Sequence, residues 1–269
     1  MIDDAVRDVS PLVPPLRNGD PPLAVLVDYD GTIALTDVSD VVVATHAPGG
    51  WEHFAALYDE GRLGSRRLME WEVARMPADP APLLDTAAEQ PLDPGFVSFV
   101  RLARSARVPV EVVSDGFGFF IGPALTRLGI AGLPVATAAM TWPGSGPPTI
   151  AWPNGHPRCF VCGTCKRQRV IAHRAAGRAV VFIGDGESDR YAAGYADLVF
   201  ATRELVTICR ENGWPHRGWR DFAGIETWLA ATLEAWRIDP ATPLMPRPLE
   251  HPFFCGPEVW GDDVADPPA

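Results

Sequence analysis

The sequence predicts an α/β protein built on a parallel sheet sandwiched by helices, with a small all-helical domain inserted after the first strand. Short aliphatic runs alternate along the chain with helical patterns, which is typical of parallel strands joined by helices. Three of these runs, at residues 23–27, 108–113 and 179–183, each end in a segment that holds an acid and a glycine. Ligands bind at the carboxyl ends of the strands in such sheets. We therefore expect the three segments to form one site.

Length and composition agree with one large domain and a smaller insert. The chain has 269 residues, of which 47% are hydrophobic, an ordinary fraction for a globular protein. Its net charge of -11 argues against nucleic acids and anionic membranes as partners, because both bind basic surfaces. No apolar stretch approaches the ~18 residues of a membrane span, and the acidic start does not resemble a signal peptide. We expect a cytoplasmic monomer or homodimer.

Proline content and helical spacing divide the chain into four parts. A proline-rich leader and a proline-rich tail flank a core that is interrupted by the helical insert. The expected parts are the leader at 1–22, the core at 23–35 and 93–236, the insert at 36–92 and the tail at 237–269. The expected helices of the insert are 41–46, 51–60, 65–76 and 81–89.

The core is expected to continue as alternating helices and strands. An apolar stripe predicts a first core helix at 94–106. The other expected helices are 119–128, 166–176, 188–196, 204–212 and 222–236. The other expected strands are 108–113, 133–137, 179–184 and 198–201, the last at the edge of the sheet, with a hairpin between 138 and 158.

The segment after the first strand carries two carboxylates, Asp28 and Asp30, followed by Gly31 and Thr32. At ~4 Å two like unit charges cost about 4 kcal/mol at an effective dielectric constant near 20. A divalent cation removes that cost, and Mg²⁺ prefers oxygen ligands of this kind. A strand that ends in an ordinary Asp-Gly turn would explain the same residues without chemistry. The choice between the two depends on the rest of the chain.

Three further pieces with polar or charged side chains follow along the chain. Ser114-Asp115-Gly116 ends the second apolar run, and Asp185 and Asp189 follow the later one. Between them stands Lys166, the one lysine of the sequence, where arginine supplies every other cationic side chain. A lysine is ordinarily a solvated surface residue. A single lysine at this place, at the start of a predicted helix, instead indicates an anion-binding role.

The order Asp-x-Asp-Gly-Thr, Ser-Asp-Gly, lysine and Gly-Asp-x-x-x-Asp resembles the haloacid dehalogenase superfamily of phosphohydrolases over residues 22–236. The resemblance implies that Asp28 is a nucleophile that forms an aspartyl-phosphate, and that Asp30 is the general acid and base. The residues implied to bind phosphate are Thr32, Ser114, Asp115, Gly116 and Lys166. The residues implied to form the Mg²⁺ site are Asp28, Asp30, Asp185 and Asp189. Asp28 and Asp185 would ligate the ion with the backbone carbonyl of Asp30, and Asp189 would lie behind these ligands or bridge to Lys166. The helical insert would be a cap that covers the site and selects the substrate.

Asp30 also favours a reaction class, because the superfamily's ATPases and dehalogenases lack this acid. The first hypothesis is a phosphatase that acts on a small phosphorylated metabolite. A phosphotransferase or phosphomutase with the same machinery is the second. A binding protein that has lost the chemistry is the third, and the complete set of acids with Lys166 argues against it.

Two local stretches narrow the resemblance. Residues 150–153 and 162–166 resemble the 2-hydroxy-3-keto-5-methylthiopentenyl-1-phosphate phosphatases of methionine salvage. The second motif is closer to the phosphoethanolamine and phosphocholine phosphatases, where an acid after the serine meets a cationic amine, here Asp115 with Asp40. The cap-side candidates for selectivity are Asp37, Asp40, Trp51, Arg62 and Arg66. Each is equally explained as an exposed residue of the insert.

Cys159, Cys162 and Cys165 have a spacing that suggests zinc or an iron–sulfur cluster. Such a site needs a fourth ligand, for which His156 or Cys209 would have to come near. Reduced structural thiols beside Lys166 are the alternative.

Overall fold

In the computed structural model of the chain, residues 13–47, 49–60, 62–156 and 161–240 are described. They form a seven-stranded sheet of order β4-β3-β2-β1-β5-β6-β7. All neighbouring strands are parallel except β3 and β4. The strands are β1 (Leu23–Val27), β2 (Val110–Phe117), β3 (Val135–Thr141), β4 (Thr149–Ala151), β5 (Ala179–Gly184), β6 (Leu198–Ala201) and β7 (His216–Gly218). The expected α/β class is confirmed.

The central strand β1 is buried on both faces, which is why its sequence is apolar throughout. Leu23, Val25 and Val27 face one core cluster, whereas Ala24 and Leu26 face the other. Helices α5 (Phe96–Ser105), α6 (Gly118–Arg127) and α10 (Phe222–Ile238) cover the first face. Helices α7 (Lys166–Ala175), α8 (Arg190–Ala193) and α9 (Arg203–Glu211) cover the second. Within the described ranges, no helix is both long and apolar enough to cross a membrane.

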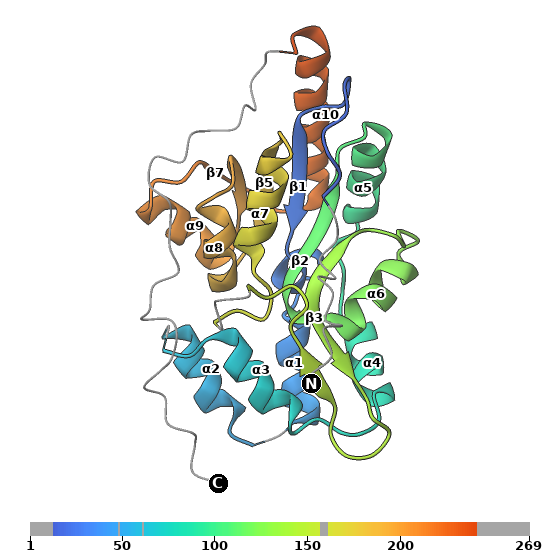
Figure 1. Ribbon diagram of the computed structural model, residues 1–269, viewed down its shortest axis with the longest axis vertical. Coiled ribbons are helices and arrows are strands. Elements are labelled where there is room, and N and C mark those ends of the chain that lie inside the picture. Colours follow the sequence, from blue (N-terminus) through green and yellow to red (C-terminus); the bar gives the residue numbers. More distant parts are fainter. Residues whose placement is uncertain (1–12, 48, 61, 157–160, 241–269) are drawn as a thin grey trace, which may run out of the picture.

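Four helices inserted after β1 form a helical cap at the carboxyl end of the sheet (Figure 1). They are α1 (Val38–His46), α2 (Trp51–Asp59), α3 (Ser65–Val73) and α4 (Ala81–Ala88). Phe54, Leu57 and Leu63 form a small apolar cluster within the cap, apart from the two clusters of the sheet. The insert therefore lies where it can cover the ends of β1, β2 and β5.

Several expected elements differ from the structure. The edge-strand assignment of 198–201 is wrong, because β7 pairs with β6 and takes the edge. The segment His-Arg-Gly of β7 has no apolar pattern, so nothing in it predicted a strand. The helix expected at 188–196 is a 3-10 turn, η2 (Glu187–Asp189), followed by the short α8. Strand β2 runs on through Ser114-Asp115-Gly116 to Phe117, with an irregular register against β3. The hairpin is confirmed as the antiparallel pair β3–β4.

Candidate active site

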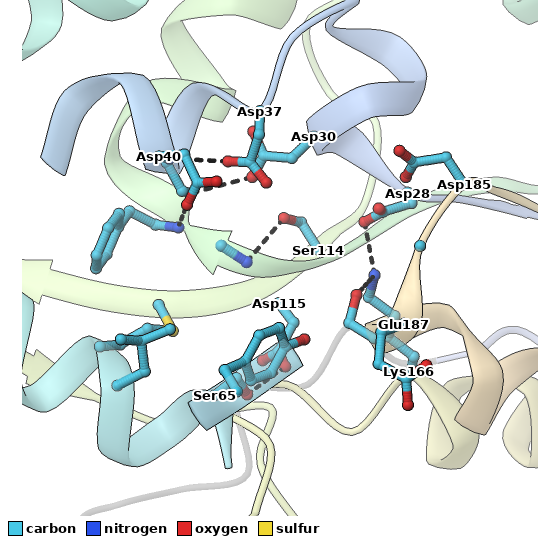
Figure 2. A pocket seen from close by; sticks show the side chains of 18 of the residues that line it. Asp28, Asp30, Asp37, Asp40, Ser65, Ser114, Asp115, Lys166, Asp185 and Glu187 are labelled. Atoms are coloured by element: carbon cyan, nitrogen blue, oxygen red, sulfur yellow. Dashed lines mark hydrogen bonds and ion pairs between the residues drawn. The ribbon is translucent and has the colours of Figure 1, made fainter. Parts of the chain in front are cut away.

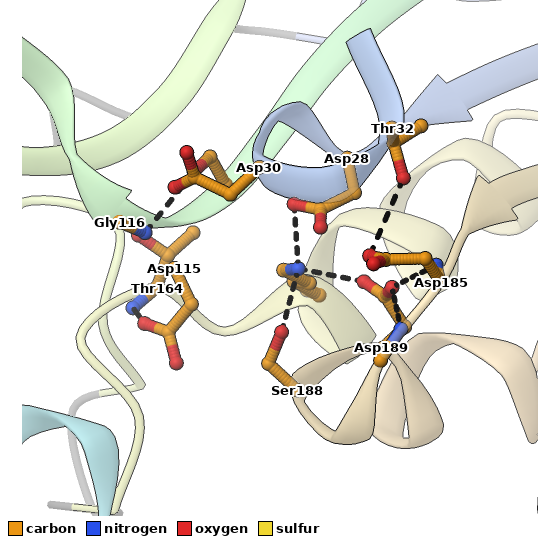
Figure 3. Close-up of polar contacts among 12 residues, drawn as sticks. Asp28, Asp30, Thr32, Asp115, Gly116, Thr164, Asp185, Ser188 and Asp189 are labelled. Carbon is orange, nitrogen blue, oxygen red and sulfur yellow. Dashed lines mark hydrogen bonds and ion pairs between the residues drawn. The ribbon is translucent and has the colours of Figure 1, made fainter. Parts of the chain in front are cut away.

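Asp28 follows β1 directly and is 4% exposed. Its Oδ1 accepts a hydrogen bond from Lys166 Nζ at 2.7 Å. Lys166 begins α7 and is 2% exposed. Its ammonium also donates to Asp189 Oδ1 at 2.6 Å and to Ser188 Oγ at 3.0 Å (Figure 3). Segments 138 and 23 residues away from Lys166 along the chain thus meet at one ammonium group.

The buried ammonium is held in its charged form. Burial opposes the charge, but the carboxylates of Asp189 and Asp28 outweigh it and raise the pKa of Lys166 above its usual value. The three N–H donors of a lysine ammonium match the three acceptors around it. Lys166 therefore presents a fixed positive charge beside Asp28.

Both carboxylate oxygens of Asp189 accept short hydrogen bonds from the protein, whereas the contacts of the Asp185 carboxylate are longer. Asp189 Oδ2 accepts the backbone N–H of Asp185 at 2.8 Å and of Gly186 at 3.2 Å. Asp185 pairs with the exposed Arg203 at 3.1 Å, and Thr32 Oγ1 donates to it over a long 3.5 Å. Thr32, expected at the phosphate, thus directs its hydroxyl toward Asp185.

Gly31 allows the loop after β1 to approach the loop after β5, which carries Asp185. Its φ of 68° lies in the left-handed region, which side chains rarely adopt. A Cβ at Gly31 would lie 2.1 Å from Asp185 Oδ2. Only glycine at this position allows Asp28 and Asp185 to share one site.

The carboxylates of Asp28, Asp185 and Asp189 each offer an oxygen within 4.8 Å of the others. Burial, followed by the charges of neighbouring acids, raises the pKa of Asp28 and brings that of Asp185 to about 7. The single positive charge of Lys166 does not balance the negative charges of three carboxylates at this spacing. The donor set is all oxygen and fits a hard divalent cation. The carboxylate of Asp30 turns elsewhere, and the group of Asp30 that is expected at the ion is its backbone carbonyl.

Asp30 faces the start of the cap. Its Oδ1 accepts the backbone N–H of Val38 at 2.9 Å, and its Oδ2 accepts the Ser39 hydroxyl at 3.0 Å. Burial, with a smaller effect of Asp37, raises the pKa of Asp30 well above its usual value. A raised pKa favours the protonated form of a carboxyl, which is the form that can give a proton to a leaving group.

Asp28, Asp30, Ser114 and Lys166 line one cavity of about 170 Å³ between the sheet and the cap (Figure 2). Ser114 is buried, and its Oγ accepts the N–H of Gly116 at 3.0 Å. Asp185 lines the same cavity, so all four predicted motif segments meet there.

Asp115 lines the same cavity, but the protein engages both of its carboxylate oxygens. Ser65 Oγ of α3 donates to Oδ2 at 2.5 Å, and Thr164 N–H donates to Oδ1 at 2.7 Å. The expectation that Asp115 meets a substrate amine together with Asp40 stays a prediction. The carboxylate of Asp115 joins the cap to the segment before Lys166.

The cap-side candidates divide into two groups. Asp37 and Asp40 line the cavity, and Asp37 Oδ1 also accepts the Asp40 N–H at 2.8 Å. Arg62 and Arg66 do not contribute to the described walls. Arg62 is exposed and pairs with Glu60 at 2.9 Å. Arg66 donates to the Cys162 carbonyl at 3.1 Å, and its guanidinium group lies 5.2 Å from the centroid of the Trp152 ring. The side chain of Trp51 lies outside the described residues.

Sequence reasoning missed Glu72, a buried acid of α3 that lines the cavity. Ser65, Met69, Glu72 and Val73 are the buried residues of this helix. Their spacing is that of one helical face. An acid on the face that also carries Met69 and Val73 was the signal that could have revealed it.

The cysteine motif gains no support as a metal site. Cys159 lies outside the described residues. Among the residues that are described, the acidic group around Asp28 is the one cluster of potential metal ligands, and it contains neither Cys162 nor Cys165.

A profile of haloacid dehalogenase-like hydrolases matches residues 25–194, which is more than half of the chain. The chain belongs to this family. The hydrolase is 31% identical over 216 residues to a 2-hydroxy-3-keto-5-methylthiopentenyl-1-phosphate phosphatase of Geobacillus thermodenitrificans, covering 74% of this chain and 92% of the relative. The corresponding enzyme of Brevibacillus brevis is 28% identical over 74% of this chain and 91% of the relative. The hydrolase is a phosphatase of phosphoric monoesters.

Solved structures agree with this fold. A phospho-aspartyl intermediate analogue of phosphoserine phosphatase superposes with a TM-score of 0.58 at 17% identity, over 78% of this hydrolase and 99% of that chain. A family hydrolase of Salmonella enterica gives a TM-score of 0.59 at 15% identity, over 76% of this chain and 70% of the other. At such low sequence identities, the similarity shows a shared fold alone.

Proposed function

We propose that this phosphatase hydrolyses the phosphomonoester of a small metabolite through an aspartyl-phosphate on Asp28. The observation that carries the proposal is Asp28 itself, buried at the end of β1 with one oxygen on Lys166 at 2.7 Å. Its other oxygen accepts no hydrogen bond from the described residues, and Asp28 lines the cavity. A carboxylate placed in this way can attack a phosphorus atom bound beside the ammonium.

In the first half-reaction, an oxygen of Asp28 forms a bond to phosphorus while the bond from phosphorus to the ester oxygen breaks. The proton of Asp30 goes to the departing alkoxide, so that a neutral alcohol leaves. Lys166 and the Ser114 hydroxyl face the oxygens of the transferred group, where negative charge must be balanced. Their fixed positions mean that little reorganisation accompanies the transfer.

In the second half-reaction, water attacks the phosphorus of the aspartyl-phosphate. Asp30, now ionised, takes a proton from this water as the new oxygen–phosphorus bond forms. The bond between phosphorus and Asp28 breaks, and the carboxylate and inorganic phosphate are released. Asp30 ends with its proton restored, ready for the next ester.

Asp28 and Asp185 would hold a Mg²⁺ ion, with Asp189 orienting Asp185 and Lys166 around them. The ion would balance the charge of the acids and of the phosphate when bound. This assignment is supported by the all-oxygen donor set and by the group of three carboxylates.

Phosphate release measured over a panel of phosphate esters with Mg²⁺ tests the proposal. Asp28→Asn should lower turnover at least about 10³-fold, because an amide cannot serve as the nucleophile. Asp85→Asn, an exposed change on α4, should leave turnover intact. Rapid acid quenching should trap a phosphoenzyme that hydroxylamine cleaves. Unchanged turnover in Asp28→Asn would contradict the proposal, and a faster reaction with added alcohol acceptors would favour phosphotransfer.

A further inference from the structure

A second hollow lies at the end of the sheet away from the cap, where β2 and β3 begin (Figure 1). We call it the rear pocket. Its volume is about 210 Å³, and a cavity of about 150 Å³ is already large enough to hold benzene. Most of the described residues that line it are apolar, among them Val13, Val108, Val110 and Leu133. The rear pocket therefore has room and apolar walls for a small organic molecule.

The leader closes one side of the rear pocket with Val13 and Pro14. Two arginines of the core hold this segment in place. Arg178 Nη1 donates to the Pro14 carbonyl at 2.7 Å. Arg107 Nη2 donates to the Gly19 carbonyl at 2.9 Å. This wall is therefore fixed to the core by hydrogen bonds.

One buried polar atom in the lining has no partner. His173 of α7 lines the rear pocket and is 2% exposed. Its Nε2 lies 2.8 Å from Glu111 Oε2. Burial opposes the ionisation of Glu111, but His173 and Arg169 outweigh it and lower the pKa of Glu111. The ionised carboxylate is an acceptor, so Nε2 carries the hydrogen of that bond.

The other ring nitrogen of His173, Nδ1, is buried and makes no hydrogen bond with the described residues. Leaving a buried polar atom without a partner costs free energy. A ligand that forms a hydrogen bond with Nδ1 would remove this cost. The rear pocket thus combines apolar walls with one polar group that a ligand can satisfy.

The charges around His173 favour an acid as this ligand. Glu111 is the one carboxyl group among the described residues of the lining. Its charge is already balanced by Arg169, which donates to its two oxygens at 2.6 Å and 3.0 Å. Arg104 of α5 lines the same pocket and adds a positive charge at its exposed side. A hydrogen bond between a carboxylate and a protonated imidazole is of the strong, charge-assisted kind.

We propose that the rear pocket binds a small monocarboxylic acid with a compact apolar body. The ligand carboxylate accepts a hydrogen bond from His173 Nδ1, which takes up a proton from solvent on binding, and it is attracted by Arg104. The carbon chain contacts the valine and leucine walls. This site lies apart from Asp28 and Lys166, so the proposal goes beyond the phosphatase reaction and does not depend on it.

A ligand-observed NMR titration of the full chain with isovalerate tests the proposal. Isovaleramide has the same shape without the charge, and acetate has the charge without the branched body. We expect isovalerate to bind with a Kd of about 1 mM or lower, at least about fivefold more tightly than either of the other two. The titration is repeated with Mg²⁺ and saturating inorganic phosphate, which should leave the Kd of isovalerate unchanged.

Two variants assign the binding to the proposed residues. His173→Gln keeps a side-chain N–H for Glu111 but removes the ring nitrogen Nδ1, and it should weaken isovalerate at least about fivefold. Arg104→Gln should weaken isovalerate about threefold or more and leave isovaleramide within about twofold. Arg101→Gln is the matched control, because Arg101 is an exposed arginine of the same helix that is not among the described lining residues. A cooperative thermal unfolding transition shows that each variant is folded.

Several results would overturn the proposal. One is a Kd of isovalerate above about 10 mM, and another is equal affinity for isovalerate and isovaleramide. Displacement of isovalerate by phosphate would place the acid at the active site instead. Unchanged affinity in both His173→Gln and Arg104→Gln would place it elsewhere on the surface. Each of these results leaves the proposed phosphatase reaction standing.

Discussion

At the scale of single residues, the site depends on one buried cation among acids. Lys166 contacts Asp28 and Asp189, and both acids would face each other across a buried space without it. Removing one partner of a buried ion pair ordinarily costs about 3–5 kcal/mol, because the remaining charge is left uncompensated. The ammonium group of Lys166 therefore holds the two acids together, in addition to the role proposed for it at the phosphoryl group.

Lys166→Met should lower kcat by at least about 10²-fold and also destabilise the protein. The loss of catalysis follows from the missing positive charge at the transferred phosphoryl group. Steady-state phosphate release and urea unfolding measure the two effects. Arg101→Met, an exposed change on α5, controls for the loss of a cation. Normal kcat in Lys166→Met would contradict the assignment of Lys166 to the phosphoryl group.

A second buried ionic cluster lies on β2, away from the cavity. Glu111 accepts hydrogen bonds from Arg169 Nε at 2.6 Å and Nη2 at 3.0 Å, and it contacts His173 Nε2 at 2.8 Å. Burial opposes ionisation, but His173 and Arg169 outweigh it and lower the pKa of Glu111 below its usual value. A lowered pKa means that ionised Glu111 stabilises the folded protein at neutral pH.

Glu111→Gln should lower the free energy of unfolding by about 3 kcal/mol at neutral pH. The contribution of Glu111 is fully present above its unfolded pKa of 4.5 and is lost as the pH falls through the lowered folded pKa. The difference between wild type and variant should therefore shrink in acid. Urea unfolding at several pH values measures it, and a difference that grows in acid would refute the assignment.

At the scale of elements, the first turn of α3 docks the cap onto the segment before Lys166. Ser65 donates to Asp115, and Arg66 N–H donates to the Val161 carbonyl at 3.0 Å. Gly64 is needed here, because a Cβ would lie 2.6 Å from that same carbonyl. The cap therefore contacts the core beside Lys166, so we expect the position of the cap and that of Lys166 to be coupled.

Ser65→Ala should loosen this contact, raise KM several-fold and speed amide hydrogen exchange at Thr164, whose N–H Asp115 holds. A lost hydrogen bond to a charged partner is worth about 1.5–3 kcal/mol. Ser105→Ala, an exposed position at the end of α5, is the control. Unchanged exchange at Thr164 would show that the Ser65 contact does not hold the cap.

At the scale of the whole molecule, parallel strand order concentrates the acids. β1 lies between β2 and β5 in the sheet, so the ends of three strands that are distant in sequence deliver their carboxyl groups to one place. The accumulated negative charge at Asp28, Asp185 and Asp189 opposes folding unless a cation binds there.

Saturating Mg²⁺ should consequently raise Tm by several degrees, because a ligand that binds only the folded state stabilises it by about 2.7 kcal/mol at a concentration 100-fold above Kd. Asp185→Asn should abolish most of this shift while leaving the protein folded without metal. Thermal unfolding with Mg²⁺ and with a chelator measures both. An equal shift in Asp185→Asn would place the ion elsewhere.

The sequence by itself determined the α/β class, the helical insert and the order of the motifs around Asp28, Ser114, Lys166 and Asp185. These follow from apolar runs and from unusual residues, which are local properties of the chain. The polar β7 was missed, because neighbouring strands rather than its own composition place it in the sheet.

The tertiary structure alone decided which polar groups meet. It engaged Asp115 with Ser65 and Thr164, turned Arg66 away from the cavity, and placed Glu72 in the cavity wall. These outcomes depend on how the cap docks onto the sheet, and the hydrogen bonds of Asp115 and Arg66 join residues that are 49 to 96 positions apart in the sequence. The spacing of residues along the chain predicts which side chains are neighbours on the same helix or strand. It does not predict contacts between distant segments, because their packing depends on the sum of many weak contacts.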